Sequence, residues 1–335
     1  MLARKLGIDL GTSAMRVGVR GHGVVVDEAS LVAIDRSSGR VAAIGPQAQE
    51  LAAREPDAIR TARPVRNGAI DDIVVTEGVL DHLIHLGRRR QRLFRSDVMV
   101  AISTRATSTE RRAITKAAIS GGARQAWLID MPLAAALGAG LPVRERRAQL
   151  VADLGAGKTE LAVLSLSGAA VSRAVRLGGA ALDESIRDDL ERRSQLVVNE
   201  RTAELLKVAT GSAVPLDEPL SMEVRGRDAR SGEPRVVTAS SDQVAKAIEP
   251  PLRALAAAVR GIVDDTPPGL AADLAETGMV LTGGGALLRG IDRYLAADTG
   301  LPVRIAGEPA TCVVRGAQAA LEDFAVFRGR QPYLR

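Results

Sequence analysis

Two segments of the sequence, one near the N-terminus and one near mid-chain, share an aspartate followed by a glycine turn. Asp9 opens the first segment and Asp153 the second, and apolar residues flank each turn. This pattern predicts a strand, a tight turn and a second strand. Backbone N–H groups exposed by a glycine turn can bind a phosphate group. The turn residues are Gly11, Thr12 and Ser13 in the first segment, and Gly155, Ala156 and Gly157 in the second.

The aspartate that begins each turn suits a magnesium ion. Mg²⁺ prefers one or two carboxylates, often through retained waters, together with phosphate oxygens. Asp9 and Asp153 would supply those carboxylates, one from each segment. Two such turns could therefore hold a polyphosphate and its metal ion from both sides.

A third glycine loop, Gly283, Gly284 and Gly285, follows a strand predicted over 279–282. We expect this loop to open a helix over 286–297, whose first N–H groups and positive end would favour an anion or a ribose edge. From these residues alone two interpretations stay open. The three loops bind one ligand, or they are ordinary hairpins and a loop with glycine turns.

The repeated segment indicates two related halves, and predicted strands alternate with predicted helices, which is typical of an α/β protein. A capping box at Thr107 and Glu110 predicts the start of one helix. Two adjacent prolines, Pro250 and Pro251, should break or kink another. We predict helices over 133–137, 200–209 and 241–263, a strand over 125–129 and a hairpin over 223–237.

The composition is that of an ordinary globular protein. The 335 residues are 46% hydrophobic and 25% charged, which is enough chain for more than one domain. The single cysteine, Cys312, excludes an internal disulfide and a cysteine-based zinc site, and fits a reducing cytoplasm. We expect no membrane-spanning segment and no signal peptide. The net charge of +5 comes from arginines spread among acidic residues, so we expect no nucleic-acid partner.

A set of longer motifs resembles the bacterial actin homologues of the MreB and Mbl family. The matching stretches in the first half are Ala43-Ile-Gly-Pro-Gln-Ala, Arg63-Pro-Val-Arg-Asn-Gly-Ala-Ile70, Val75-Thr-Glu77, Glu110-Arg-Arg-Ala113 and Pro132-Leu-Ala-Ala-Ala-Leu-Gly138. Those in the second half are Glu200-Arg-Thr-Ala-Glu204, Leu281-Thr-Gly-Gly-Gly-Ala-Leu-Leu-Arg-Gly290 and Glu308-Pro309. The resemblance covers nearly the whole chain. It implies an actin-like ATPase fold, with two related α/β halves flanking a nucleotide cleft, and the ligands ATP and Mg²⁺.

The resemblance also implies domain limits and a role for particular residues. The first half would span 1–140 with a small subdomain at about 29–69, the second 141–310 with one at about 177–244, and 311–335 would return to the first half. The implied nucleotide-binding residues are Asp9, Gly11, Thr12 and Ser13; Asp153, Gly155 and Gly157; Gly178, Gly179 and Asp183; Glu204 and Lys207; and Gly283, Gly284 and Gly285. Without the resemblance, Glu204 and Lys207 would be interpreted as a surface ion pair on one helix face.

One departure from the family pattern concerns hydrolysis. Family members usually carry a glutamate immediately before Pro132, where it orients the attacking water, but this chain has Met131. Methionine cannot take up a proton or hold a water by a strong hydrogen bond. Because water-positioning groups contribute large factors to phosphoryl transfer, we expect ATP hydrolysis to be very slow or absent while binding survives. Asp130 is the candidate replacement, if the turn shifts its register.

A second departure lies in the second phosphate loop, where Ala156 and Lys158 replace the usual glycine and threonine. Lys158 would either contact a phosphate as a point charge or point to solvent.

The segment from Arg88 to Arg95 combines an apolar pair, Leu93 and Phe94, with a cluster of arginines. Such a loop suits an anionic membrane surface, and the resemblance supports this because family members use an apolar loop here to contact membrane. The alternative is that the pair caps the core.

The resemblance thus predicts a filament-forming, ATP-binding protein, peripheral at the cytoplasmic face of the membrane. It would organise cell-wall synthesis together with other morphogenesis proteins. The alternatives are an actin-fold small-molecule kinase or active ATPase, and a scaffold that binds ATP without polymerising. A kinase would need a carboxylate base aimed at the acceptor hydroxyl, and none can be nominated.

Overall fold

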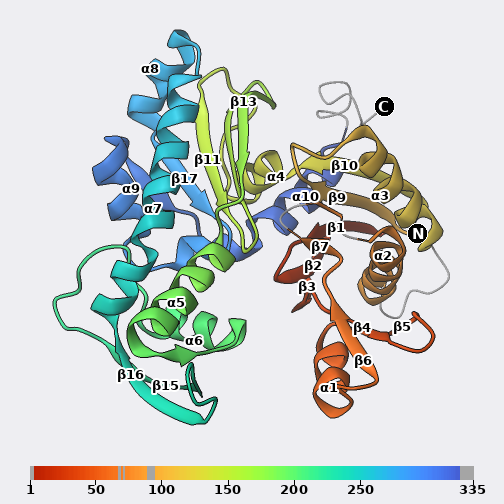
Figure 1. Cartoon of the computed structure of the whole chain (residues 1–335). Coiled ribbons are helices and arrows are strands. Elements are labelled where there is room, and N and C mark those ends of the chain that lie inside the picture. Colours follow the sequence, from red (N-terminus) through yellow and green to blue (C-terminus); the bar gives the residue numbers. More distant parts are fainter. Residues whose placement is uncertain (1–3, 67–68, 71, 89–94, 325–335) are drawn as a thin grey trace.

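The computed structural model describes residues 4–66, 69–70, 72–88 and 95–324, and it contains two halves with a five-stranded sheet each (Figure 1). The first sheet consists of β1 (Lys5–Leu10), β2 (Ala14–Val19), β3 (Gly23–Ala29), β9 (Asp97–Ile102) and β10 (Gln125–Asp130). The second consists of β11 (Gln149–Leu154), β12 (Thr159–Ser165), β13 (Gly168–Val175), β17 (Met279–Thr282) and β18 (Val303–Ile305).

The two sheets have the same topology. Their strand orders are β10-β9-β1-β2-β3 and β18-β17-β11-β12-β13. In both, the first three strands along the chain pair antiparallel, and the two later strands add in parallel beside the first. The register is equivalent as well, because Asp9 lies opposite Arg16 and Asp153 opposite Glu160. The predicted pair of related α/β halves is confirmed.

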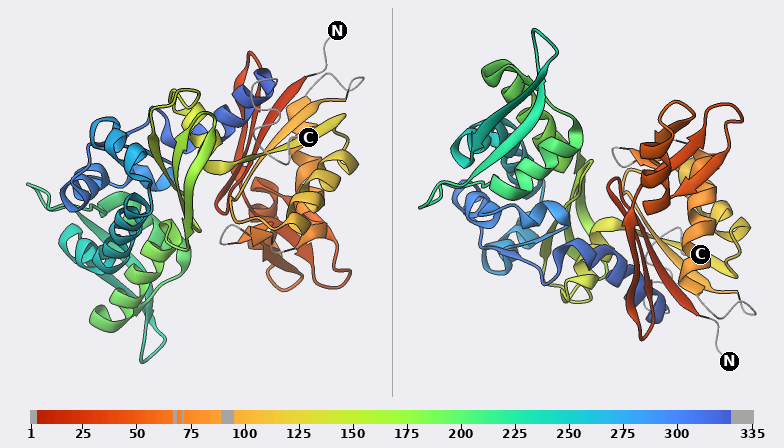
Figure 2. Two further views of the ribbon diagram at one scale, coloured as in Figure 1. Left: turned by 90° about the horizontal axis from the view of Figure 1, so that it is seen from above. Right: turned by 90° about the horizontal axis from the view of Figure 1, so that it is seen from below.

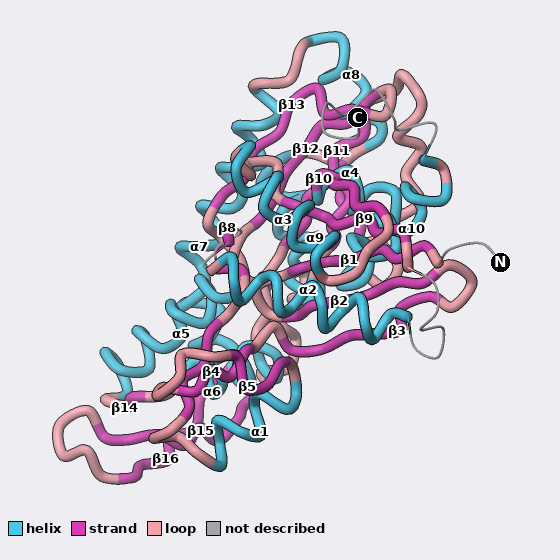
Figure 3. The backbone as a smooth tube through the Cα atoms, turned by 90° about the vertical axis from the view of Figure 1, so that its right-hand side faces the viewer, coloured by secondary structure: helices cyan, strands magenta, loops and turns pink. Residues whose placement is uncertain are grey.

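Each half also carries a small three-stranded sheet, and both small sheets lie at the same end of the molecule (Figure 3). In the first half the sheet is made by β4 (Val32–Asp35), β5 (Val41–Ile44) and β6 (Ile59–Ala62), with α1 (Pro46–Arg54) packed on it. In the second it is made by β14 (Leu196–Val197), β15 (Ser221–Asp228) and β16 (Pro234–Ser240). A two-stranded ribbon, β7 (Val65–Arg66) and β8 (Ala69–Ile70), follows the first small sheet along the chain.

Side-chain caps mark the start of some of the remaining helices. Thr107 and Glu110 exchange both capping-box hydrogen bonds, and the Asn199 side chain accepts from the N–H of Thr202 at 2.8 Å. The first half contains α2 (Ile73–Arg88), α3 (Ser108–Ser120) and α4 (Met131–Gly138). The second half contains α5 (Gly179–Ser194), α6 (Glu200–Thr210), α7 (Ser241–Asp264), α8 (Pro268–Thr277) and α9 (Ile291–Thr299).

The last helix, α10 (Cys312–Glu322), returns from the second half to the first. It packs against α4 and against β1, β2 and β9, and Figure 2 shows α4 and α10 where the two halves meet. The two helices touch at backbone distance. A Cβ on Gly138 would lie 1.8 Å from the carbonyl oxygen of Cys312, and one on Gly316 would lie 1.7 Å from that of Ala134. Cys312 itself is fully buried in this contact.

Two expectations about helices need correction. The helix predicted over 286–297 starts later than expected, because the glycine loop leads first into a short 3₁₀ turn, η1 (Gly284–Leu287). Gly290 then adopts a left-handed conformation (φ 68°), and α9 starts after it. Of the break or kink predicted at Pro250 and Pro251, the break does not occur, since α7 is continuous through both. Burial of its apolar face, which includes Ile248 and Leu252, compensates for the lost backbone hydrogen bonds. Among the described residues, no helix is both long and apolar enough to cross a bilayer.

Candidate functional site

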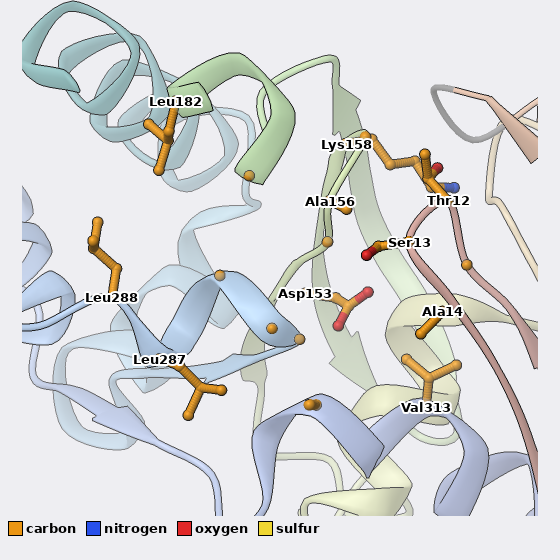
Figure 4. Close-up of a pocket in the computed structure, with 18 of the residues that line it drawn as sticks. Thr12, Ser13, Ala14, Asp153, Ala156, Lys158, Leu182, Leu287, Leu288 and Val313 are labelled. Carbon is orange, nitrogen blue, oxygen red and sulfur yellow. The ribbon is translucent and has the colours of Figure 1, made fainter. Parts of the chain in front are cut away.

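A cavity of about 420 Å³ lies between the two halves, where the turns of the two equivalent hairpins meet (Figure 4). Most of the residues singled out by sequence line it: Asp9, Gly11, Thr12, Ser13, Asp153, Gly155, Gly157, Lys158, Gly179, Glu204, Lys207, Gly283, Gly284 and Gly285. Gly178, Asp183 and Asp130 are not among the lining residues. The cavity therefore gathers segments that are distant in sequence.

Each hairpin turn is closed by the same backbone hydrogen bond. The N–H of Gly11 donates to the carbonyl oxygen of Ala14 at 3.0 Å, and the N–H of Gly155 donates to that of Lys158 at 2.9 Å. Within the described chain, no hydrogen bond uses the turn N–H groups of Thr12, Ser13, Ala156 and Gly157. These donors line the cavity and can bind anionic oxygens of a ligand.

Asp9 and Asp153 face the cavity but are almost fully buried, at 7% and 8% exposed. Burial raises the pKa of Asp9 to about 6, although the charge of Arg16 opposes the shift. Burial and the nearby charge of Asp9 raise the pKa of Asp153 to about 7, against a hydrogen bond of 2.9 Å from the hydroxyl of Thr282. Each carboxylate therefore has fewer partners than a buried charge requires.

This pair of aspartates fits a magnesium ion. Two buried carboxylates beside free backbone donors offer the oxygen ligands that Mg²⁺ uses together with phosphate oxygens and water. In the described residues, no group of three or more His, Cys, Asp or Glu side chains could hold a metal without such help. A bound Mg²⁺ would neutralise developing charge on a polyphosphate, and Asp9 and Asp153 would hold it there.

The second turn has a cation at its end. The Lys158 ammonium forms an ion pair with Oε1 of Glu160, and its side chain is only 11% exposed. Glu160 is fully buried, and its other oxygen accepts hydrogen bonds of 3.1 Å from both the N–H and the hydroxyl of Thr104, just after β9. Lys158 therefore does not point to solvent, and its partner carboxylate joins the two halves.

The start of α5 supports the second turn from behind. The N–H groups of Gly179 and Ala180 donate to the carbonyl oxygens of Gly155 and Ala156, at 3.0 and 2.8 Å. A Cβ on Gly178 would lie 2.5 Å from the carbonyl oxygen of Ala156, so this close contact requires glycine. The N-terminus of α5 thus holds the hairpin and has its first donors occupied.

Lys207 pairs with Asp183 and not with Glu204. Its ammonium lies 2.8 and 2.9 Å from the two carboxylate oxygens and 3.1 Å from the carbonyl oxygen of Gly179. Burial raises the pKa of Asp183, while Lys207 opposes that shift. Glu204 lines the cavity from α6 but remains exposed. The surface ion pair that the spacing of Glu204 and Lys207 suggested is absent from the described residues.

Met131 and Asp130 lie on different sides of the same turn. The Met131 side chain is buried and lines the cavity. Asp130 forms an ion pair with Arg111, in which Nη2 of Arg111 lies 3.1 Å from Oδ1 of Asp130. The register shift that would bring Asp130 to the cavity is not seen.

An arginine bridges the two halves near the surface. Nη1 of Arg63 donates to the carbonyl oxygen of Thr12 at 2.8 Å, and Nη2 lies 3.2 Å from Oε1 of Glu200 at the start of α6. We call this pair of contacts the Arg63 clasp. It connects the first hairpin turn, through one guanidinium, to the helix across the cavity.

The far end of the cavity is apolar. Leu182 of α5, Val208 of α6 and the neighbouring Leu287 and Leu288 line it, and three of these side chains are visible opposite the hairpin turns in Figure 4. Gly283 has φ 79°, and a Cβ there would lie 2.4 Å from the carbonyl oxygen of Leu154, so the third glycine loop lies directly against β11. The cavity therefore offers donors and carboxylates at one end and apolar contact at the other.

Sequence reasoning missed Arg63, Glu200, Thr104 and Glu160 as contacts across the cavity. For Glu160, a signal was available, because its place opposite Asp153 predicts that it points to the same face of the sheet. The other three contact partners far away in sequence, and nothing local indicates them. Leu93 and Phe94 lie outside the described residues.

Comparison with known proteins agrees with this geometry. A model of the MreB/Mbl protein family matches residues 3–328. The cell shape-determining protein MreB of Escherichia coli K12 is 44% identical over 96% of this chain and 94% of its own length. The structure of MreB5 of Spiroplasma citri bound to ADP superimposes with a TM-score of 0.91 at 30% identity, covering 96% of this chain and 97% of that one. A MamK double helical filament shares the fold, with a TM-score of 0.80 at 21% identity, covering 96% and 99%.

The match of one family along almost the entire chain, the level of identity and the twice-repeated sheet agree with one another. This chain belongs to the MreB/Mbl family of cell shape-determining actin homologues and has the actin-like fold.

Proposed function

We propose that this chain binds ATP and Mg²⁺ in the cavity between its halves and assembles into filaments that organise cell-wall synthesis and cell shape. The observation that carries the proposal is the pair of equivalent hairpins, whose buried aspartates and free N–H groups face one cavity. Similar proteins support it, since MreB5 of Spiroplasma citri was crystallised with ADP and with AMPPNP, and MamK forms a double helical filament.

Each end of the cavity would bind one part of the nucleotide. The free N–H groups of both turns would bind phosphate oxygens, and Asp9 and Asp153 would hold Mg²⁺. The apolar end, with Leu182 and Leu288, would contact the base, while Glu204 and Lys207 would border the adenosine. Gly178, Gly179 and Asp183 would shape the site near the ribose and phosphates.

Nucleotide titration and electron microscopy test this proposal together. We expect purified protein to bind ADP with Mg²⁺ in calorimetry, and to form filaments with ATP and with AMPPNP. Asp9→Asn should weaken binding of Mg²⁺-ADP, and Asp35→Asn, at the end of β4 and outside the cavity, should not. Absence of Mg²⁺-ADP binding by the unchanged protein would refute the proposal. Binding without filaments would instead favour the non-polymerising scaffold.

Hydrolysis should be weak, because the cavity presents Met131 where a carboxylate would orient water. Met131→Glu should therefore raise the rate of phosphate release from ATP at least roughly tenfold, as expected for a restored water-positioning group. The measurement is a phosphate-release assay at saturating ATP, with Met131→Leu as the control that keeps the site apolar. Rapid hydrolysis by the unchanged protein would contradict this expectation.

For the membrane we propose contact through Leu93 and Phe94, an apolar pair within an arginine cluster. Liposomes containing anionic lipid should sediment the protein, and the double variant Leu93→Ser, Phe94→Ser should remain in the supernatant. Equal sedimentation of both proteins would exclude this contact.

A further inference from the structure

The Lys158 ammonium is a fixed cation inside the cavity. Its ion pair with Glu160 is buried, and Glu160 is itself held at its second oxygen by the N–H and hydroxyl of Thr104. A lysine that merely projects from a turn would sample many rotamers in water. This one is restrained by a carboxylate that is fixed from the other half of the molecule.

The same ammonium is close to both of the buried aspartates. Lys158, Asp9 and Asp153 all line the same cavity. The positive charge of Lys158 lowers the pKa of Asp9 against the larger effect of burial, whereas at Asp153 burial and the charges of Asp9 and Glu160 each outweigh it. Arg16 is a further cation beside Asp9, but its guanidinium also forms an ion pair with Asp27, in which Nε lies 3.0 Å from Oδ1. Lys158 therefore lies where the two hairpin turns and the two carboxylates converge.

The ammonium also retains hydrogen-bonding capacity. Among the described residues, the one acceptor that Lys158 contacts is Glu160. A lysine ammonium carries three N–H donors, so two remain available to a ligand in the cavity. Charge-assisted hydrogen bonds of this kind to phosphate oxygens are about twice as strong as neutral ones.

We propose that Lys158 is a built-in cation for the polyphosphate, so that this chain binds a nucleoside di- or triphosphate with only a weak requirement for a divalent ion. The inference rests on the nucleotide-binding function proposed above. A polyphosphate that enters between Asp9 and Asp153 meets two carboxylates, and a divalent ion normally offsets that repulsion. Lys158 supplies positive charge at the same place and remains when the metal ion is removed.

Binding of ADP in the presence of Mg²⁺ and in the presence of EDTA tests the proposal, because ADP separates binding from hydrolysis. For the unchanged protein we expect the Kd to rise by less than roughly tenfold when EDTA replaces Mg²⁺. For Lys158→Met we expect a rise of roughly a hundredfold in EDTA and a change of only a few-fold in Mg²⁺, consistent with loss of a charged hydrogen bond.

Three further variants complete the design. Lys158→Arg keeps the charge and should retain binding in EDTA. Lys116→Met, on the exposed face of α3, removes a surface lysine and should change nothing. Because Lys158→Met leaves Glu160 buried without its ion pair, the double variant Lys158→Met, Glu160→Gln removes both charges and should show the same loss in EDTA.

The outcomes separate the two proposals. A loss of more than roughly tenfold by the unchanged protein in EDTA would overturn the inference alone, as would equal losses by the unchanged protein and the Lys158 variants. In that case Lys158 serves only to neutralise Glu160. If ADP does not bind even with Mg²⁺, the proposed function falls, and this inference with it.

Discussion

Asp153 and Asp9 are both buried, and burial outweighs the effect of the cations near them, which makes the ligand-free protein sensitive to pH. Their pKa values in the folded chain, about 7 and about 6, lie above the usual value of 3.8. The folded state therefore binds more protons than the unfolded state between about pH 4 and pH 7, and this contribution to stability falls as pH rises through that window.

Asp153→Asn should remove much of this effect, because the amide keeps an acceptor for Thr282 but cannot ionise. The free energy of unfolding in urea, without nucleotide or metal, should be measured for both proteins at pH 5 and at pH 8. Between these pH values, the free energy of unfolding of the variant should rise relative to that of the unchanged protein by roughly 2–3 kcal/mol. The control is Asp35→Asn. Asp35 has a pKa lowered to about 2 by hydrogen bonds from Ser37 and Ser38, so its titration is complete below pH 5. A stability difference for Asp153→Asn that does not change with pH would contradict the prediction.

For individual residues of the site, the sequence predicted the structure where it depends on neighbouring residues in the chain. The turns at Asp9 and Asp153 follow from residue types within a few positions, and the structure has both hairpins with equivalent closing bonds. The partner of Lys158, Glu160, lies only two residues along the chain, but the burial of Glu160 and its contact with Thr104 depend on the other half of the molecule, so the ion pair was not predicted. The pairing of Lys207 with Asp183 was missed for the same reason, since it joins two helices.

Among the elements, α4 and α10 cross with their backbones in close contact. Gly316 of α10 lies against the backbone of α4, and a methyl group there would fall 1.7 Å from the carbonyl oxygen of Ala134. Gly316→Ala should therefore separate the helices and destabilise the protein by at least about 2–3 kcal/mol. Gly78→Ala in α2 is the matched control, because nothing lies within 4 Å of that position.

In Gly78→Ala we expect a gain of about 0.5–1 kcal/mol, because alanine loses less conformational freedom than glycine in a helix. Chemical unfolding of both variants measures the contrast. Equal effects of the two substitutions would show that the helix crossing tolerates expansion.

Element boundaries set by caps, such as Thr107 and Asn199, were predictable. The start of the helix expected over 286–297 was not, because it depends on the left-handed conformation of Gly290.

For the whole molecule, the Arg63 clasp is the exposed connection across the cavity. Loss of it in Arg63→Ala should let the halves separate more often and speed nucleotide dissociation by roughly three- to tenfold, since partly exposed ion pairs contribute about 1 kcal/mol or less. Stopped-flow displacement of a fluorescent ADP measures this rate. Arg60→Ala, an exposed arginine on β6, is the control and should leave the rate unchanged.

An unchanged dissociation rate in Arg63→Ala would mean that the buried contact between Thr104 and Glu160 is enough to hold the halves together.

The presence of two related halves was predictable from the repeated segment, because each copy folds locally. The contacts that join the halves were not, because Arg63 and Glu200 carry no local pattern that pairs them.

The position of α10 also has a consequence for synthesis of the chain. A ribosome releases β1, β2 and β9 early, but the helix that covers one face of these strands is released only after all the strands of the second sheet. The second half, by contrast, has all five strands of its sheet available before α10 emerges. The half that begins first should therefore finish folding second, and its sheet stays dependent on other protection, from a chaperone or from the ribosome surface, until residue 322 has left the exit tunnel.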